Sequence, residues 1–259
     1  MEKSHKLVDK IVTNGILPRM RCKIWELLLD KSSHVDQATY EQLGENVEIA
    51  KKERAHEVLS DRSESFRLIE LDLERTFPAI AFFQEESLMK GKLQTVLERF
   101  CFWKREIGYV QGMSFVVAHL LLYNEPFNAF NVFLGLINRS SLLKSFLMLD
   151  REKMNHWFEV FRELFEKTLP DLYKNFIPLE LFYDIYLTSW LMTLYTRCLS
   201  LEVAGRVWDC FFIFGDLYLL HAAIGILRAF RDQISGQSLE IVSRILQEGP
   251  KVFLDLFQI

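Results

Sequence analysis

The stretch WFEVFRELF, residues 157–165, decides the fold class of this chain. Its apolar side chains, Trp157, Val160, Phe161, Leu164 and Phe165, recur at the spacing that places them on one face of a helix. The same periodicity returns in segment after segment, whereas the strict alternation of a half-buried strand is scarce. The sequence therefore predicts an all-α protein, and its length fits somewhat over ten helices of ordinary size.

Composition limits the size of the fold and the kinds of partner. The chain has 259 residues, of which 50% are hydrophobic, enough for one large domain or two coupled lobes. Its formal net charge is -4 and its pI is about 5.9. A mildly acidic chain has no general attraction for nucleic acid or for an anionic membrane surface, so we expect no nucleic-acid partner.

Cysteine usage and hydropathy argue against several other classes. The four cysteines are dispersed, without a CxxC pair or clustered histidines, so neither a zinc site nor a disulfide framework is expected. The longest apolar stretches, around residues 114–123 and 217–227, are too short to span a bilayer, and residues 1–10 are charged and polar rather than signal-like. We therefore expect a cytoplasmic protein without a transmembrane segment and without a metal of its own.

The first of three informative stretches is GILPRMRCKIW, residues 15–25. Pro18 can open a helix, and Arg21 and Trp25 are four residues apart on one helical face. Taken alone, this stretch indicates the start of a helix with a tryptophan in the core.

The second stretch is IELDLERTFP, residues 69–78. Ile69, Asp72 and Arg75 follow at three-residue intervals, close to one helical face. Pro78 disfavours helix through Phe77, so Arg75 is expected in the last turn or just beyond it, where it can project outward. Asp72 could hold the Arg75 guanidinium or form only a surface ion pair with it.

The third stretch is IGYVQGMSF, residues 107–115. Gly108 and Gly112 bracket Gln111, and glycine permits unusual backbone angles and the close approach of another backbone. The apolar run at residues 114–123 predicts a buried helix, which places Gln111 where a loop meets that helix. The alternative is a turn whose glutamine satisfies local backbone groups.

Together, in this order and spacing, the three stretches resemble the signature motifs of the TBC domain. Two later stretches agree with the resemblance: SWLMTLY at residues 189–195, and RVWDCFF at residues 206–212 followed by Gly215. The chain departs from the family pattern at Leu17, where a proline is frequent, at Ser114, where asparagine is common, and at Phe214, where an acidic residue often stands.

The resemblance implies a fold and a domain organisation. It implies an all-α, two-lobed, V-shaped multi-helix domain over residues 1–259, with a catalytic N-terminal lobe at about 1–137 and a helical C-terminal lobe at about 138–259. Five motif residues would hold this scaffold together: Arg21, Trp25, Trp190, Trp208 and Asp209.

The resemblance also implies a function, that of a GTPase-activating protein for a Rab-family small GTPase. Such a protein regulates an enzyme and lends it catalytic residues in trans. At the matching positions, Arg75 would neutralise charge on the transferring phosphate and Gln111 would orient the attacking water. Asp72, Tyr109 and Gly112 would support these two residues and shape the contact with the partner.

Cofactors and location follow from the same resemblance. The chain would bind no cofactor, because GTP and Mg²⁺ would belong to the GTP-bound Rab, and it would associate peripherally with endomembranes through that Rab in vesicle trafficking. Two alternatives remain open. One is a non-catalytic Rab-binding adaptor, which usually lacks the arginine or the glutamine, and the other is a helical scaffold in which the motif residues only pack.

Overall fold

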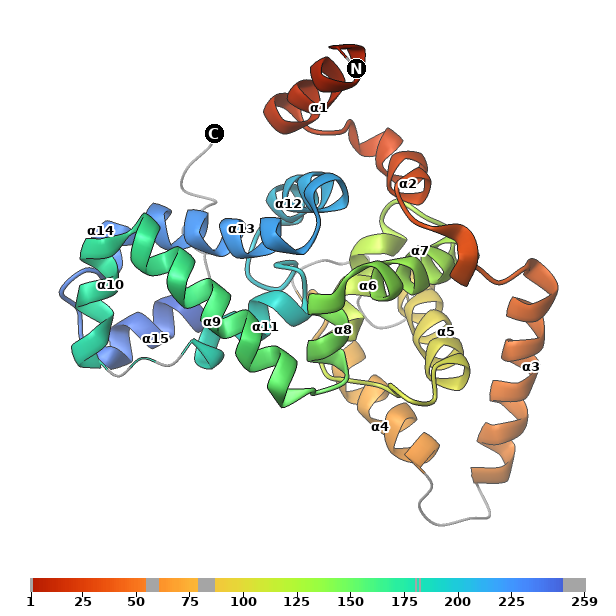
Figure 1. Ribbon diagram of the computed structural model, residues 1–259. Helices are drawn as coiled ribbons and strands as arrows, with labels where there is room; N and C mark the ends of the chain where they lie inside the picture. Colours follow the sequence, from red (N-terminus) through yellow and green to blue (C-terminus); the bar gives the residue numbers. More distant parts are fainter. Residues whose placement is uncertain (1, 55–60, 79–86, 180, 182, 249–259) are drawn as a thin grey trace. The chain divides into compact units, whose positions relative to one another are not determined.

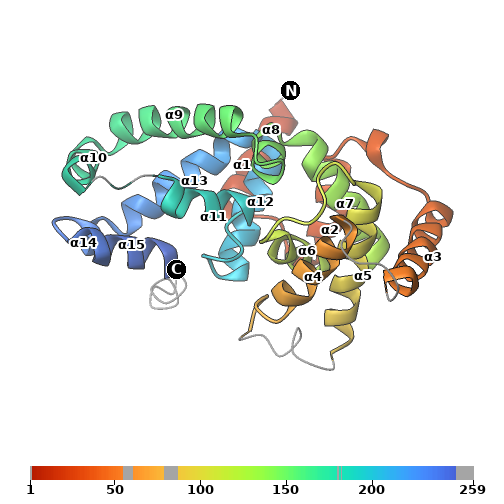
Figure 2. The same cartoon turned by 90° about the horizontal axis from the view of Figure 1, so that it is seen from below.

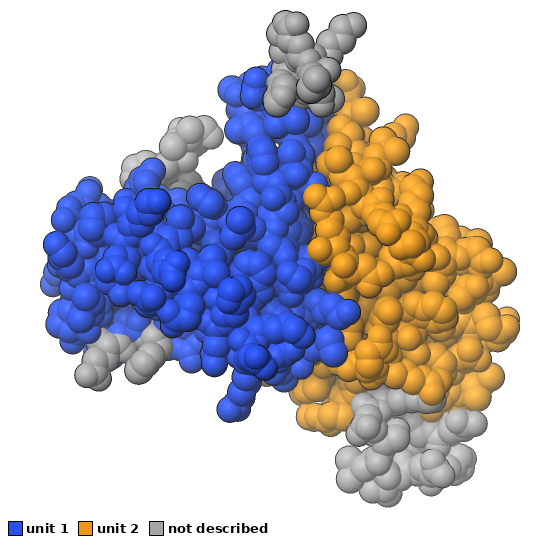
Figure 3. All heavy atoms as spheres, in the orientation of Figure 1, with its two compact units in different colours: residues 1–17, 140–259 blue, residues 18–139 orange. Residues whose placement is uncertain are grey.

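The chain forms helices and no strand in the part that the computed structural model describes, which is residues 2–54, 61–78, 87–179, 181 and 183–248 (Figure 1). This confirms the all-α prediction. The chain divides into two compact units: unit 1 contains residues 1–17 and 140–259, and unit 2 contains residues 18–139 (Figure 3).

Unit 2 is built around one central helix. Its elements are α2 (Pro18–Leu27), the 3₁₀ turn η1 (Lys31–Ser33), α3 (Gln37–Arg54), α4 (Asp61–Leu73), α5 (Leu88–Trp103), α6 (Met113–Leu121) and α7 (Pro126–Arg139). Helix α5 packs against α3, α4, α6 and α7, and Figure 2 shows it among α4, α6 and α7. Its residues Leu93, Val96, Leu97 and Phe100 are at most 1% exposed, which makes this face the core of the unit.

Helix α6 is buried on every side. All nine of its residues lie in the core, including the polar side chains of Ser114 and His119. A helix that is apolar all round needs neighbours on all sides, and α6 has α4, α5 and α7 beside it. The loop that enters α6 is therefore anchored in the centre of unit 2.

Unit 1 contains the remaining helices. They are α1 (Glu2–Asn14), α8 (Ser141–Leu147), α9 (Arg151–Thr168), α10 (Pro170–Phe176), the 3₁₀ turn η3 (Ile177–Leu179), α11 (Asp184–Met192), α12 (Leu201–Phe214), α13 (Asp216–Ala229), α14 (Arg231–Ile234) and α15 (Leu239–Glu248). The apolar face that predicted the fold class lies on α9, where Phe161 and Phe165 are fully buried and Trp157 is half-buried. Asp150 begins this helix by accepting a hydrogen bond from the Lys153 N–H.

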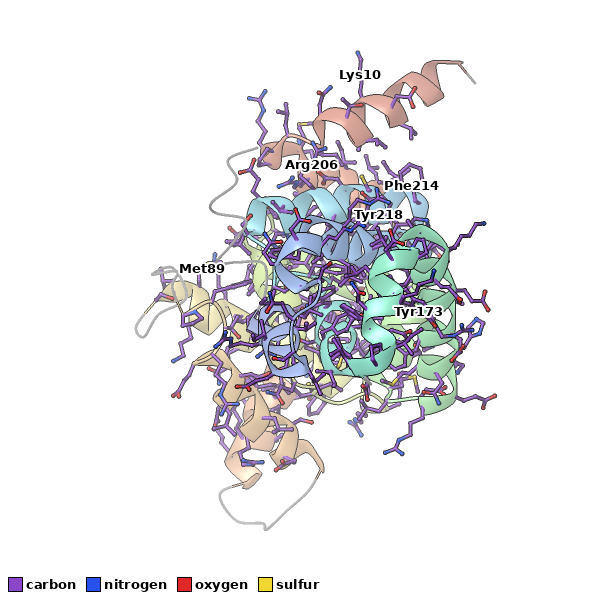
Figure 4. All side chains as sticks on the ribbon, turned by 90° about the vertical axis from the view of Figure 1, so that its left-hand side faces the viewer. Lys10, Met89, Tyr173, Arg206, Phe214 and Tyr218 are labelled. Carbon is purple, nitrogen blue, oxygen red and sulfur yellow. The ribbon has the colours of Figure 1, made fainter. Side chains whose placement is uncertain are left out.

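The turn between α12 and α13 depends on a glycine. Gly215 has a φ of 78°, a conformation that glycine adopts without a steric penalty. The rings of Phe214 and Tyr218 stack on either side of this turn with their centroids 5.8 Å apart (Figure 4). Phe214 thus places an exposed aromatic ring at this turn.

Residues 1–17 belong to a different unit from the one expected. The resemblance implies an N-terminal lobe of about residues 1–137, but α1 packs on α12 within unit 1. Arg206 of α12, labelled in Figure 4, donates to the Val12 and Thr13 carbonyl oxygens at 3.0 and 3.2 Å. The Ile16 N–H donates to Asp209 Oδ2 at 3.0 Å. These contacts span almost two hundred residues, so no local pattern predicts them.

Candidate functional site

A buried carboxylate joins two of the three sequence motifs. Asp72 lies in the last turn of α4 and is only 4% exposed. Its Oδ2 accepts a hydrogen bond from the Tyr109 hydroxyl at 2.7 Å and another from the Gly112 N–H at 3.0 Å. Hydrogen bonds to a charged acceptor are the stronger kind, so Asp72 ties the end of α4 to the loop that enters α6.

Arg75 projects from the segment that follows α4. The helix ends at Leu73, as the downstream Pro78 predicted, and the Arg75 N–H donates to the Asp72 carbonyl oxygen at 3.0 Å. The Arg75 side chain is exposed. Within the described residues no ion pair joins it to Asp72, so both versions of the expected Asp72–Arg75 contact are wrong. The physical reason is that the Asp72 carboxylate turns inward to Tyr109 and Gly112.

Gln111 stands at the junction of a loop and a helix, as predicted. Gly112 precedes α6 with a φ of 101°, which favours glycine, and its N–H is held by Asp72. The Gln111 side chain is exposed, and its amide makes no hydrogen bond to the described residues. It therefore does not serve to satisfy the local backbone, which was the alternative interpretation.

Tyr109 remains a hydrogen-bond donor under physiological conditions. Its side chain is 6% exposed, and burial raises the pKa of its phenol above the ordinary value, an effect to which the neighbouring Asp72 charge adds. The phenol therefore stays protonated and donates a hydrogen bond to Asp72. The Tyr109 N–H donates to Ser65 Oγ at 3.3 Å, which adds a second contact between α4 and the loop.

Three residues near this site were not predicted as functional. Ser65 and Thr76 contact the Gln111 loop or the start of α6, and Ser114 had been noted only as a departure from the family pattern. The sequence carried one weak signal: Thr76 follows Asp72 by four residues, the spacing at which a threonine hydroxyl reaches back to a carbonyl. Nothing local indicated that its second partner would be Ser114.

The predicted scaffold residues of unit 2 form a separate buried cluster. Arg21 is 2% exposed, donates from Nη1 to the Tyr123 hydroxyl at 3.0 Å, and places its guanidinium 5.9 Å from the Trp25 ring centre. Trp25 and Tyr123 both contact the ring of His119 on α6. Burial, reinforced by the nearby Arg21 charge, lowers the pKa of His119 to about 3.

The other three predicted scaffold residues lie in unit 1. Trp190 Nε1 donates to the Leu246 carbonyl at 3.1 Å, and Trp208 Nε1 donates to the Leu194 carbonyl at 2.8 Å. Asp209 is fully buried and accepts from the Ile16 N–H. The structure thus brings Asp72, Tyr109 and Gly112 together in unit 2. Trp190, Trp208 and Asp209 lie in unit 1.

The arrangement leaves the side chains of one arginine and one glutamine exposed. Both side chains are exposed, and the segments that carry them share the buried Asp72 carboxylate. Among the described residues, no group of three or more His, Cys, Asp or Glu side chains could hold a metal ion. No helix in the described part of the chain has the length and apolar character needed to cross a membrane.

Comparison with known proteins shows the family. The model of the Rab-GTPase-TBC domain matches residues 18–235. The chain is 32% identical over 260 residues to TBC1 domain family member 12 of Xenopus tropicalis, covering 96% of this chain and 38% of that protein. It is 33% identical over 248 residues to TBC1 domain family member 14 of Bos taurus, covering 92% and 36%. This chain therefore belongs to the Rab-GTPase-TBC domain family, and it spans less than two-fifths of the length of these relatives.

A solved structure agrees on the fold. The crystal structure of the Chlamydomonas flagellar RabGAP TBC domain superposes with a TM-score of 0.72 at 21% sequence identity, covering 93% of this chain and 77% of that one. At this identity the likeness concerns the fold alone, which is the all-α fold of a TBC domain.

Proposed function

We propose that this chain activates GTP hydrolysis by a Rab-family GTPase, supplying Arg75 and Gln111 in trans. The observation that carries the proposal is the shared Asp72 carboxylate, which binds Tyr109 and Gly112 on either side of Gln111 and lies three residues before Arg75. Two exposed polar side chains are thereby presented from one buried anchor. The family to which the chain belongs supports a Rab as the partner.

Arg75 has the properties required of an inserted arginine. Its side chain is exposed, and no salt bridge to a described residue neutralises it. A guanidinium stays charged and binds phosphate oxygens through two parallel N–H groups. Fingers of this kind contribute about 10³ to 10⁵ in rate, equivalent to roughly 4 to 7 kcal/mol of barrier.

Gln111 supplies the second requirement, an oriented water. A primary amide can accept a hydrogen bond from the attacking water through its oxygen while its nitrogen donates one to a phosphate oxygen. The amide forms no hydrogen bond within the described residues that would have to break first. Gln111 would thus do in trans what GTPases such as Ras do with a glutamine of their own.

Asp72, Tyr109 and Gly112 contribute by preorganisation. A group that is already held in place loses little freedom when the reaction occurs, and its electrostatic effect is then realised fully in the transition state. GTP and Mg²⁺ would be bound by the GTP-loaded Rab, and this chain would hold no cofactor. The protein would act in the cytoplasm, peripherally at the membrane that carries its Rab.

The test is single-turnover GTP hydrolysis by a panel of purified Rab proteins, each loaded with GTP. The variants are Arg75→Ala, Arg75→Lys and Gln111→Ala. The matched controls are Arg151→Ala and Gln42→Ala, which remove exposed side chains of the same types elsewhere. We expect strong acceleration of one or a few Rabs, losses of about 10³-fold or more without Arg75, and wild-type rates in both controls.

The remaining outcomes separate the alternatives. Acceleration that survives Arg75→Ala would show that Arg75 is not the arginine supplied to the GTPase. Binding of a GTP-loaded Rab without acceleration by the wild-type chain indicates the non-catalytic adaptor instead.

A further inference from the structure

Two consecutive residues after Arg75 contact two consecutive residues at the start of α6. Thr76 is 1% exposed and Ser114 is fully buried, and their hydroxyl oxygens lie 2.7 Å apart. The rings of Phe77 and Phe115 meet edge to face with their centroids 5.3 Å apart. The segment that carries Arg75 therefore runs in register with the first turn of the helix that follows Gln111.

The direction of the hydroxyl hydrogen bonds follows from proton counting. Thr76 Oγ1 also lies 2.7 Å from the Asp72 carbonyl oxygen, which can only accept. A threonine hydroxyl has one proton, so Thr76 donates to the Asp72 carbonyl and accepts from Ser114. Both hydroxyls are buried. Removing the Thr76 hydroxyl leaves Ser114 without its acceptor, and removing the Ser114 hydroxyl takes away the bond that Thr76 accepts while its bond to the Asp72 carbonyl remains.

The Asp72 hydrogen bonds and the Thr76–Ser114 bond attach the segment that carries Arg75 at two points. The Asp72 carboxylate holds the loop at Tyr109 and Gly112, which fixes one point of α6 against α4. This attachment precedes Arg75 in the sequence, so the residues that follow Arg75 are held by contacts of their own. The Thr76–Ser114 bond is a second point, and Arg75 lies between the two.

The backbone at Phe77 shows that this geometry is imposed by packing. Phe77 has a φ of 49°, in the left-handed region that non-glycine residues enter only at an energetic cost. Such a conformation persists only where the surroundings determine it, and Phe77 is 1% exposed against Phe115. The inward turn at residues 76 and 77 accompanies the outward projection of Arg75.

We infer that Thr76 and Ser114 are positioning residues of the activation reaction, because their paired hydroxyls hold Arg75 in a fixed orientation relative to Gln111. The inference rests on the proposed function. Neither side chain is accessible to a partner, since both are almost completely buried. The pair therefore governs the rate of hydrolysis within the complex, and the affinity for the GTPase does not depend on it.

The experiment measures GTP hydrolysis by the Rab that the wild-type chain accelerates most, in the presence of each of four variants of this chain. Thr76→Val removes the hydroxyl at constant volume, Ser114→Ala removes its partner, and Thr76→Ser keeps the hydroxyl. The control is Thr196→Val, which removes a fully buried hydroxyl that bonds to the Thr193 carbonyl in unit 1. Single-turnover rates are measured over a range of chain concentrations, with thermal unfolding of each variant beside them.

We expect Thr76→Val and Ser114→Ala each to lower the saturating rate by about tenfold to a hundredfold, because misplacement by about 1 Å has an effect of this size. The half-saturating concentration should stay within about twofold, Thr76→Ser should retain most of the rate, and Thr196→Val should keep the full rate. In an Arg75→Ala background Thr76→Val should lower the rate no further, because its effect acts through Arg75.

A second measurement needs no partner and remains informative if a variant is less stable. Amide hydrogen exchange of the free chain should accelerate at Arg75 and Gly112 together in Thr76→Val and Ser114→Ala, and at neither residue in Thr196→Val. Unchanged exchange at both amides, or saturating rates within about twofold of wild type while Arg75→Ala is inactive, overturns the positioning role alone. Full activity of Arg75→Ala overturns the proposed function and this inference with it.

Discussion

Asp72→Asn tests the anchor of the site with little change in side-chain volume. The carboxylate accepts two hydrogen bonds, from the Tyr109 hydroxyl at 2.7 Å and the Gly112 N–H at 3.0 Å, in a position that is 4% exposed. A hydrogen bond to a charged group contributes about 1.5 to 3 kcal/mol, and a neutral one contributes about 1 kcal/mol. Converting both bonds from charged to neutral should therefore lower the free energy of unfolding by about 2 kcal/mol.

The assay is urea unfolding at pH 7, followed by two spectroscopic probes and extrapolated linearly to water. Asp171→Asn is the matched control, because Asp171 is an exposed aspartate whose 3.3 Å ion pair with Arg231 should contribute at most about 0.5 to 1 kcal/mol. Tyr109→Phe removes one of the two bonds to Asp72. The double variant Asp72→Asn/Tyr109→Phe should lose about 1 kcal/mol less than the sum of the single losses, because the two residues share a bond.

The reasoning is refuted if Asp72→Asn unfolds within about 0.5 kcal/mol of the wild-type chain, as a surface substitution would. Full additivity of the two substitutions would contradict it as well, since independent residues add and bonded residues do not.

Two further predictions concern buried contacts away from Asp72. His119 has a pKa of about 3 in the folded chain and an ordinary value of 6.5, so the unfolded chain takes up its proton first and stability falls as the pH drops below 6.5. Between pH 7 and pH 5 the free energy of unfolding should fall by about 2 kcal/mol for this reason. Urea unfolding at the two pH values should show a smaller fall in His119→Leu and the wild-type fall in the exposed control His156→Leu. Gly15→Ala should loosen α1, because Gly15 has a φ of 76° and a new Cβ would lie 2.7 Å from Cδ of Arg206. Amide exchange over residues 8–14 should be faster in this variant and unaltered in Gly91→Ala, whose Cβ would meet no atom within 4 Å.

Much of the local structure was predictable because its causes are local. Apolar periodicity within two helical turns predicted the all-α class and the buried face of α9. Pro78 restricts the residue before it, so the end of α4 before Arg75 could be predicted from the sequence. The same holds for Gln111, which was expected at a loop–helix junction because glycines flank it and an apolar run follows.

The contacts between distant segments could not be predicted in this way. The pairing of Thr76 with Ser114 joins residues 38 positions apart, and that of Ile16 with Asp209 joins residues 193 positions apart. Spacing along one helix suggested that Asp72 would face Arg75, but the carboxylate faces another segment. A one-dimensional pattern records which face of a helix is apolar and does not record which segment will cover it.

The sequence by itself determined that the chain is helical, where its helices end around the two motifs, and which residues carry the family signature. Only the tertiary structure decided that one buried carboxylate would serve both motifs and that residues 1–17 would join the C-terminal unit. The physical reason is the distance along the chain over which each effect acts. Helix propensity, capping and proline act within a few residues, whereas the partner of a buried polar group is fixed by the packing of α4, α5 and α6 around it.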